Sequence, residues 1–132
     1  MGLGIDILKI SRISRLIQRS PEWEKNFLKK CLCENEIKKY NLIKSNSSLP
    51  RLSEQAKWLA VRWCVKEAVF KALQPNFRVY MSMMEYVRTP TGYPSVVIHD
   101  PRFPLSPVMV SVSHEEDLVV ANALYLPSMP KT

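Results

Sequence analysis

The sequence predicts an α+β fold in which helices pack on an antiparallel sheet. In the first half of the chain, apolar residues recur at helical spacing, above all over residues 53–73. In the second half, short segments rich in β-branched residues alternate with turn residues such as those at 89–92. A chain of 132 residues suits one core, so the whole of 1–132 is expected to form a single domain.

The individual elements follow from these patterns in chain order. A short strand is expected over residues 3–8, where β-branched residues flank Asp6. Helices are expected where the apolar spacing is close to one turn, over 9–20, 22–32, 34–43 and 53–73. Ser53 is the expected N-cap of the last and longest helix. Strands are expected over 78–88, 93–99, 107–113 and 118–126, separated by the turns 89–92 and 114–117.

Composition narrows the class of protein. The formal net charge is +7, from 19 Lys and Arg against 12 Asp and Glu, which favours an anionic partner: nucleic acid, a phosphorylated small molecule or an acidic protein. No apolar run is long enough to span a bilayer, and residues 1–7 lack the pattern of a signal peptide. Cys31, Cys33 and Cys64 are odd in number and have no partners at zinc spacing, so free thiols in a reducing, intracellular compartment are expected.

Glu67 is unusual because it lies in the middle of the most apolar predicted helix. On a helical wheel it shares a polar stripe with Lys71, and small Ala60 and Cys64 border that stripe. Small neighbours allow another element to approach closely, so Glu67 is expected to be at least half buried. The alternative is an ordinary surface ion pair between Glu67 and Lys71, worth about 0.3–0.5 kcal/mol.

Asp6 raises the same question, because a carboxylate inside a hydrophobic strand is costly unless a positive group meets it. It could instead cap the helix that follows. Two half-buried carboxylates in one small domain suggest a magnesium ion, which prefers oxygen ligands and is usually shared with substrate phosphates. Lys71 would then neutralise phosphate charge rather than only pair with Glu67.

A third group of polar residues is expected at the end of the predicted strand 107–113. Ser111 and Ser113 project from one strand face, while the valines beside them face the core. His114 follows at the strand end, where hydroxyls and an imidazole can converge on a ligand. A purely structural hydrogen bond is the alternative role for such a histidine.

Three segments together resemble the holo-acyl-carrier-protein synthases, which are small phosphopantetheinyl transferases. The segments are GIDIL…SRI at 4–13, WLAVRWCVKEAVFKAL at 58–73 and SVSHEEDLVVANAL at 111–124, in the family's order and at fitting separations. The resemblance spans nearly the whole chain, and it implies the 4′-phosphopantetheinyl transferase fold. The small trimeric bacterial enzymes and their fungal mitochondrial counterparts look closest. One departure is Gln74-Pro75-Asn76, which stands where the family has a glycine-rich turn.

The resemblance also implies an activity. The family transfers the 4′-phosphopantetheine of coenzyme A to a serine of apo acyl carrier protein and releases adenosine 3′,5′-bisphosphate. Asp6 and Glu67 match the family's magnesium-binding carboxylates, and Lys71 matches the lysine near the pyrophosphate. Glu67, acting through a metal-bound water, is the implied base for the carrier serine. The polar residues of 111–114 match the segment that lines the coenzyme site.

Arg12, Arg15 and Arg19, here called the arginine stripe, fall within about 60° on one face of the first predicted helix. Acyl carrier proteins are strongly acidic, and in the family this helix docks against them, so the stripe is the expected carrier-binding surface. A solvated face without a partner is the alternative. The family's small members are homotrimers with coenzyme A sites at subunit boundaries, which implies a homotrimer here.

Two other functions fit parts of the sequence. A basic nucleic-acid-binding module would use the same charge, with Trp58, Trp63 or Tyr40 for stacking, but would leave Asp6 and Glu67 without a role. A non-catalytic coenzyme A-binding subunit would keep the phosphate contacts without needing both carboxylates. Transfer is therefore the favoured function, with no nucleic acid or membrane as partner. The expected location is intracellular: mitochondrial in a eukaryote, otherwise the bacterial cytoplasm.

Overall fold

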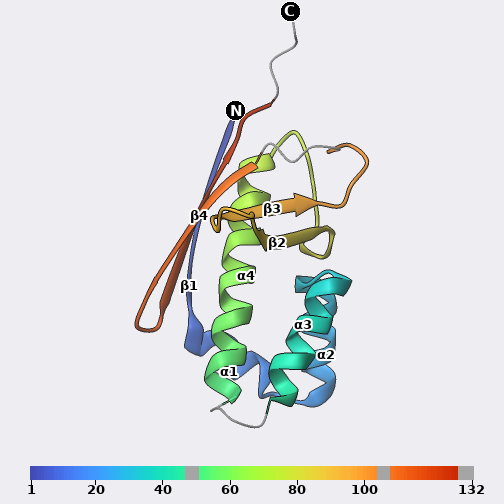
Figure 1. Ribbon diagram of the computed structural model, residues 1–132, viewed down its shortest axis with the longest axis vertical. Coiled ribbons are helices and arrows are strands. Elements are labelled where there is room, and N and C mark those ends of the chain that lie inside the picture. The colour runs from blue at the N-terminus through green and yellow to red at the C-terminus, as the bar shows by residue number, and fades with distance from the viewer. Residues whose placement is uncertain (47–50, 104–107, 128–132) are drawn as a thin grey trace, which may run out of the picture.

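The computed structural model describes residues 1–46, 51–103 and 108–127 and confirms the predicted α+β fold (Figure 1). The first half holds one strand and the helices, in the order β1 (Gly2–Lys9), α1 (Ile10–Ile17), α2 (Pro21–Cys31), α3 (Glu34–Ser45) and α4 (Arg51–Leu73). The second half holds a short 3-10 helix and four strands: η1 (Met81–Met83), β2 (Met84–Arg88), β3 (Pro94–Ile98), β4 (Val108–Glu115) and β5 (Leu118–Tyr125).

The strands form two antiparallel sheets. A three-stranded sheet has the order β1-β5-β4, so the first strand of the chain pairs with the last, and Asp6 lies opposite Ala121. The second sheet is the β2–β3 hairpin. Figure 1 shows α4 running along one face of the three-stranded sheet, with the hairpin lying across it. The helix that carries Glu67 therefore packs against both sheets.

The core lies between α4 and the inner face of the three-stranded sheet. The helix contributes fully buried small and β-branched side chains, namely Val65, Ala68, Val69 and Ala72. The sheet contributes the residues that alternate toward the helix, namely Leu8, Val119, Ala121 and Ala123. Gly4 permits an especially close approach of β1 to α4, because a Cβ there would lie 1.8 Å from the Ala68 carbonyl oxygen. The Asp6 strand and the Glu67 helix are thus held in direct contact.

Two details differ from the sequence-based expectations. The longest helix begins at Arg51, so Ser53 lies inside it and is not its N-cap. The segment 78–88 is not a strand throughout, because η1 precedes the five residues of β2. The three cysteines are free, as expected, and all three are buried. In the described part of the chain, no helix has both the length and the apolar character needed to cross a membrane.

Candidate active site

Asp6, Glu67 and Lys71 are brought together where β1 crosses α4. The Lys71 ammonium donates to Asp6 Oδ1 at 3.2 Å and to the Ile5 carbonyl oxygen at 2.9 Å. Its ion pair is therefore with Asp6 of the strand, and the surface pair with Glu67 that was the alternative from the sequence is not the one that forms. Cys64 makes a further contact between the helix and the strand, since its thiol donates to the Asp6 carbonyl oxygen at 3.3 Å. The small residues around Glu67 thus admit the strand, as their pattern predicted.

Glu67 has an unusual electrostatic environment. Burial raises the pKa of its carboxyl group, and the nearby Asp6 carboxylate raises that pKa further. Lys71 acts in the opposite direction and lowers the pKa of Glu67. Part-buried carboxyl groups whose pKa is shifted by a charged neighbour are typical of functional sites. Because burial and the Asp6 carboxylate disfavour the ionised form of Glu67, a cation bound beside these two residues would stabilise that form.

A cavity of about 720 Å³ opens beside Glu67. Its walls are mostly aromatic and aliphatic side chains, namely Leu8, Ile13, Leu16, Trp23, Phe27, Trp63, Phe70, Tyr80 and Met81. Arg12, Lys29 and Lys30 add positive charge to its lining. A largely apolar cavity whose lining includes one carboxylate and several cationic side chains suits a ligand that has both an uncharged part and an anionic end.

The carboxylates also fit a magnesium ion by the chemistry of their oxygens. Proteins commonly hold magnesium through one or two carboxylates and leave the remaining positions to water and substrate phosphate. Across residues 1–46, 51–103 and 108–127, no group of three or more His, Cys, Asp or Glu side chains is placed to hold a metal ion. A magnesium ion held by Asp6 and Glu67 would therefore need water or substrate oxygens to fill its remaining positions.

The predicted convergence of Ser111, Ser113 and His114 is wrong for a single chain. Residues alternate along β4, and Ser111 lies opposite Asn122 on the exposed outer face of the sheet. His114 lies opposite buried Val119 and therefore projects from the other face of the strand. Successive side chains of a strand point to opposite faces, and His114 directly follows Ser113. His114 could share the face of the two serines only if the strand ended before it, but β4 extends to Glu115.

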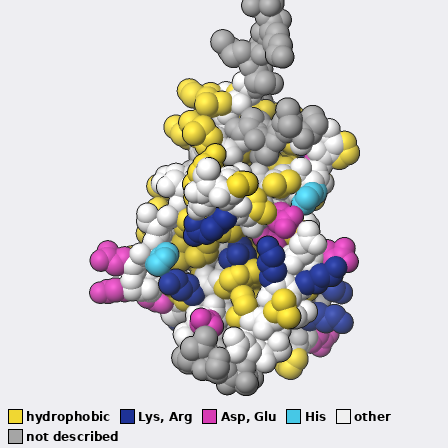
Figure 2. Space-filling model, viewed as in Figure 1, with side chains coloured by type: hydrophobic (Ala, Val, Ile, Leu, Met, Phe, Trp, Pro, Cys, Tyr) yellow, Lys and Arg dark blue, Asp and Glu magenta, His cyan; other side chains and the backbone are white. Residues whose placement is uncertain are grey.

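His114 instead lines a second cavity, of about 380 Å³, whose lining includes Lys57, Arg62 and Arg88. The two cavities share no lining residue. Figure 2 shows Lys and Arg side chains gathered among hydrophobic ones across the middle of the face that Figure 1 presents. The lining also includes one carboxylate, Glu54, so the lysine and the two arginines leave this cavity with a net positive charge that favours an anionic ligand.

Arg62 is held in place by several contacts, and sequence patterns did not single it out. Its guanidinium lies 3.6 Å from the centre of the Trp58 ring and 5.1 Å from that of Tyr86, and it donates to the Trp58 carbonyl oxygen at 3.1 Å. Burial lowers its pKa to about 10. Among the described residues, its Nε is the buried side-chain nitrogen or oxygen left without a hydrogen-bond partner.

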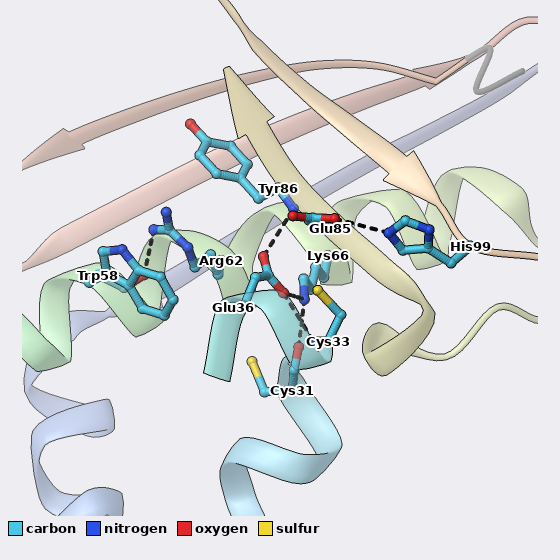
Figure 3. Close-up of polar contacts among 9 residues, drawn as sticks. All are labelled: Cys31, Cys33, Glu36, Trp58, Arg62, Lys66, Glu85, Tyr86 and His99. Carbon is cyan, nitrogen blue, oxygen red and sulfur yellow. Dashed lines mark hydrogen bonds and ion pairs between the residues drawn. The ribbon is translucent and has the colours of Figure 1, made fainter. Parts of the chain in front are cut away.

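A buried ion pair lies behind Arg62 (Figure 3). Lys66 pairs with Glu36, and both side chains are almost completely shielded from solvent. Glu36 also accepts from the backbone N–H of Cys33 at 3.1 Å and of Tyr86 at 3.0 Å. One carboxylate thus joins α3, α4 and β2. Lys66 follows Arg62 by one helical turn on α4, and the three-dimensional packing shows that its side chain is fully buried.

The arginine stripe lies on the exposed side of α1 and just beyond its end, while Ile13 and Ile17 fix the helix to the core. Arg12 also lines the cavity beside Glu67. Arg19 lies over the Trp23 ring, 4.8 Å from its centre. The stripe therefore reaches from open surface to the mouth of the Glu67 cavity.

Comparison with known proteins identifies the relatives of this chain. The family model described as the 4′-phosphopantetheinyl transferase superfamily matches residues 2–123. The holo-[acyl-carrier-protein] synthase of Chlorobaculum parvum is 33% identical over 129 residues, covering 96% of this chain and 99% of the relative. That of Clostridium botulinum is 30% identical over 129 residues, covering 93% of this chain and 94% of the relative.

Solved structures agree with these matches. The holo-(acyl-carrier-protein) synthase of Bacillus anthracis, in complex with CoA (3′,5′-ADP), is 26% identical with a TM-score of 0.67, and 92% of each chain is covered. The enzyme of Neisseria meningitidis is 25% identical with a TM-score of 0.70, covering 92% of this chain and 94% of that one. The chain therefore belongs to the 4′-phosphopantetheinyl transferase superfamily, among the holo-[acyl-carrier-protein] synthases.

Proposed function

We propose that this chain transfers the 4′-phosphopantetheine group of coenzyme A to a serine hydroxyl of apo acyl carrier protein and releases adenosine 3′,5′-bisphosphate. The observation that carries the proposal is the meeting of Asp6 and Lys71 with Glu67, which itself lines a largely apolar cavity. These residues combine the charges that a pyrophosphate requires with a chamber that suits the uncharged pantetheine arm. The family membership of the chain supports the same reaction.

In the reaction, the carrier serine oxygen attacks the phosphorus atom that bears the pantetheine. A new serine O–P bond forms, the bond from that phosphorus to the oxygen of the adenosine bisphosphate breaks, and the serine proton must leave. Glu67 is the base in this proposal, since its raised pKa makes its carboxylate a stronger base than an exposed one. Lys71 stabilises the negative charge that develops on the phosphoryl oxygens, because its ammonium is already held beside the two carboxylates.

Asp6 and Glu67 are the residues that would hold magnesium at this site. When bound there, the ion would offset the charge of the pyrophosphate and lower the cost of bringing it beside two carboxylates. Lys71 would then exchange part of its contact with Asp6 for contact with phosphate. Its side chain is half exposed, which leaves it free to do so.

The nucleotide end of coenzyme A fits the second cavity, where Lys57, Arg62 and His114 can meet its phosphate groups. Because the two cavities share no lining residue, one ligand would reach both most simply across a subunit boundary. A homotrimer would provide that boundary. It would also cover the outer face of the three-stranded sheet, where Leu3, Ile5 and Ile7 are all more than half exposed. Ser111 and Ser113 lie on that same face and would then meet a neighbouring subunit.

The nucleic-acid-binding alternative is disfavoured by the aromatic side chains it would need. Tyr40 is fully buried, and its hydroxyl donates to Glu24 at 2.7 Å. Trp63 is stacked on Phe27, and Trp58 holds Arg62. A non-catalytic coenzyme-binding subunit would leave the meeting of Asp6 with Glu67 unexplained.

The curated relatives named above are bacterial, so only the sequence resemblance to fungal forms supports a mitochondrial location.

The proposal is tested by following the second product. The protein is incubated with coenzyme A, magnesium and a purified apo acyl carrier protein, and adenosine 3′,5′-bisphosphate is quantified by chromatography. Release that depends on both magnesium and the carrier supports transfer. Release without the carrier would indicate hydrolysis of coenzyme A, and no release with several carriers would favour a binding role.

A further inference from the structure

Helix α1 lacks a cap of its own. Its N-cap residue is Lys9, whose side chain makes no capping hydrogen bond, and its first turn contains no acidic residue. Arg12 places a positive charge in that turn, where the helix dipole is also positive. The first N–H groups of a helix need acceptors from elsewhere. Asp6, one possible cap in the sequence, is instead occupied by Lys71.

The missing cap is supplied by Asp117, from a segment 106 residues further along the chain. Its Oδ1 accepts the backbone N–H of Ser11 at 2.9 Å, and its Oδ2 accepts the Ser11 hydroxyl at 2.6 Å. Its carbonyl oxygen accepts the Ile10 N–H at 2.7 Å. The hydrogen bond from Ser11 lowers the pKa of Asp117, so the carboxyl group is ionised at neutral pH. One residue therefore satisfies two backbone donors and the side chain of the helix start.

Asp117 belongs to the hairpin that joins β4 and β5. It follows Glu116, whose φ of 52° makes the turn, and it lies three residues after His114 of the second cavity. The same short hairpin thus touches the proposed nucleotide site on one side and the carrier-binding helix on the other.

We propose that Asp117 is a positioning residue for the carrier protein. Its cap holds the first turn of α1, and with it Arg12, at the mouth of the cavity beside Glu67. The rest of the helix does not depend on the cap to the same degree, because Ile13 and Ile17 are buried in the core. Loss of the cap frays the first turn, displaces Arg12 and weakens carrier docking, while the coenzyme site stays in place through the pairing of β4 with β5. This inference rests on the proposed transfer function.

The test compares three variants of the full-length protein in the transfer assay. Asp117→Ala removes the side-chain acceptors and is expected to raise the KM for the carrier about five- to tenfold, the range that follows from the usual effect of losing an N-cap. The KM for coenzyme A and the turnover at saturating carrier should stay within about twofold of wild type. Asp117→Asn keeps an acceptor and is as good an N-cap, so it should restore the KM for the carrier. Glu115→Ala removes a charge from the same hairpin without touching the cap and should behave as wild type.

A KM for the carrier that is unchanged in Asp117→Ala would overturn the proposal. So would equal losses toward both substrates without rescue by Asn, since these would indicate general damage to the fold. If Asp117→Ala does not fold, Ser11→Ala gives the answer, because it removes only the hydroxyl contact and should raise the same KM about two- to threefold.

Amide hydrogen exchange keeps this inference separate from the proposed function. In Asp117→Ala, the Ile10 and Ser11 amides should exchange about tenfold faster, and the amides of α4 should be unchanged. A wild-type protein with no transfer activity overturns the proposed function whatever the exchange result. Unchanged exchange at Ile10 and Ser11 overturns the cap whatever the activity.

Discussion

Lys71 lies one turn beyond Glu67 on the same helix, yet its ammonium pairs with Asp6 of β1, 3.2 Å away. The pairing crosses from helix to strand because Gly4 and Cys64 let the strand backbone approach α4 closely. As a result, one cation and two carboxylates lie together, and within the described part of the chain Glu67 has no salt-bridge partner of its own. This arrangement is poor as a surface salt bridge but suits the binding of a metal ion and a pyrophosphate.

The first prediction concerns Glu67. Glu67→Gln keeps the shape of the side chain but removes its charge, so the rate of transfer should fall by about 10²–10³-fold or more. The melting temperature should be unchanged or slightly higher, because burial and Asp6 already disfavour the charged form of Glu67. Steady-state kinetics and thermal unfolding check both points, with Glu115→Gln as the control. Near-normal turnover in Glu67→Gln would show that this carboxylate takes no part in the reaction.

The second prediction concerns the arginine stripe. Replacing Arg12, Arg15 and Arg19 with Ala should raise the KM for the carrier at least about tenfold and flatten its dependence on salt, because an acidic partner is steered by these charges. The KM for coenzyme A should barely change. Lys38→Ala with Lys39→Ala, on the exposed side of α3, lowers the net charge elsewhere and serves as the control. Equal weakening toward both substrates would argue against a separate docking surface.

A structural feature can be predicted from the sequence when the residues that determine it lie close together in the chain. The helices, the strand around Asp6 and the approach of an element to Glu67 follow from apolar spacing and small residues, which act within a few turns. The pairing of β1 with β5 brings residues over 110 positions apart together, as in Gly2 with Tyr125, and no local pattern encodes it. The Lys66–Glu36 pair and the capping of Ser11 by Asp117 depend on such long-range packing and were missed for that reason.

The third prediction concerns assembly. We expect a trimer at micromolar concentration, held by the outer face of the three-stranded sheet. Leu3→Lys should dissociate it and lower activity, because Leu3 is 75% exposed on that face and a buried lysine there would lack a partner. Leu42→Lys, at a position 71% exposed on α3, should leave the trimer intact. Sedimentation equilibrium measures the mass, and a fully active monomeric wild type would exclude both the trimer and a shared site.

The fourth prediction concerns the pH dependence of the Asp117 cap. Because the fold lowers the pKa of Asp117, its stabilising contribution is present above the ordinary pKa of an unfolded Asp, about 3.9. That contribution is lost as the pH falls through the lower folded value. The urea midpoints of wild type and Asp117→Ala should therefore differ at pH 7 and converge in strongly acidic solution. A difference that stays constant over this range would show that the fold does not lower the pKa of Asp117.

The most direct test of the account is the mass of the carrier protein itself. Apo acyl carrier protein is incubated with coenzyme A, magnesium and either wild type or Glu67→Gln, and the intact carrier and its peptides are weighed by mass spectrometry. Wild type should add one phosphopantetheine to one serine, and Glu67→Gln should leave the carrier unmodified over the same period. An unmodified carrier with folded wild-type protein, or equal modification by both proteins, would contradict the assignment of Asp6, Glu67 and Lys71 as the site of transfer.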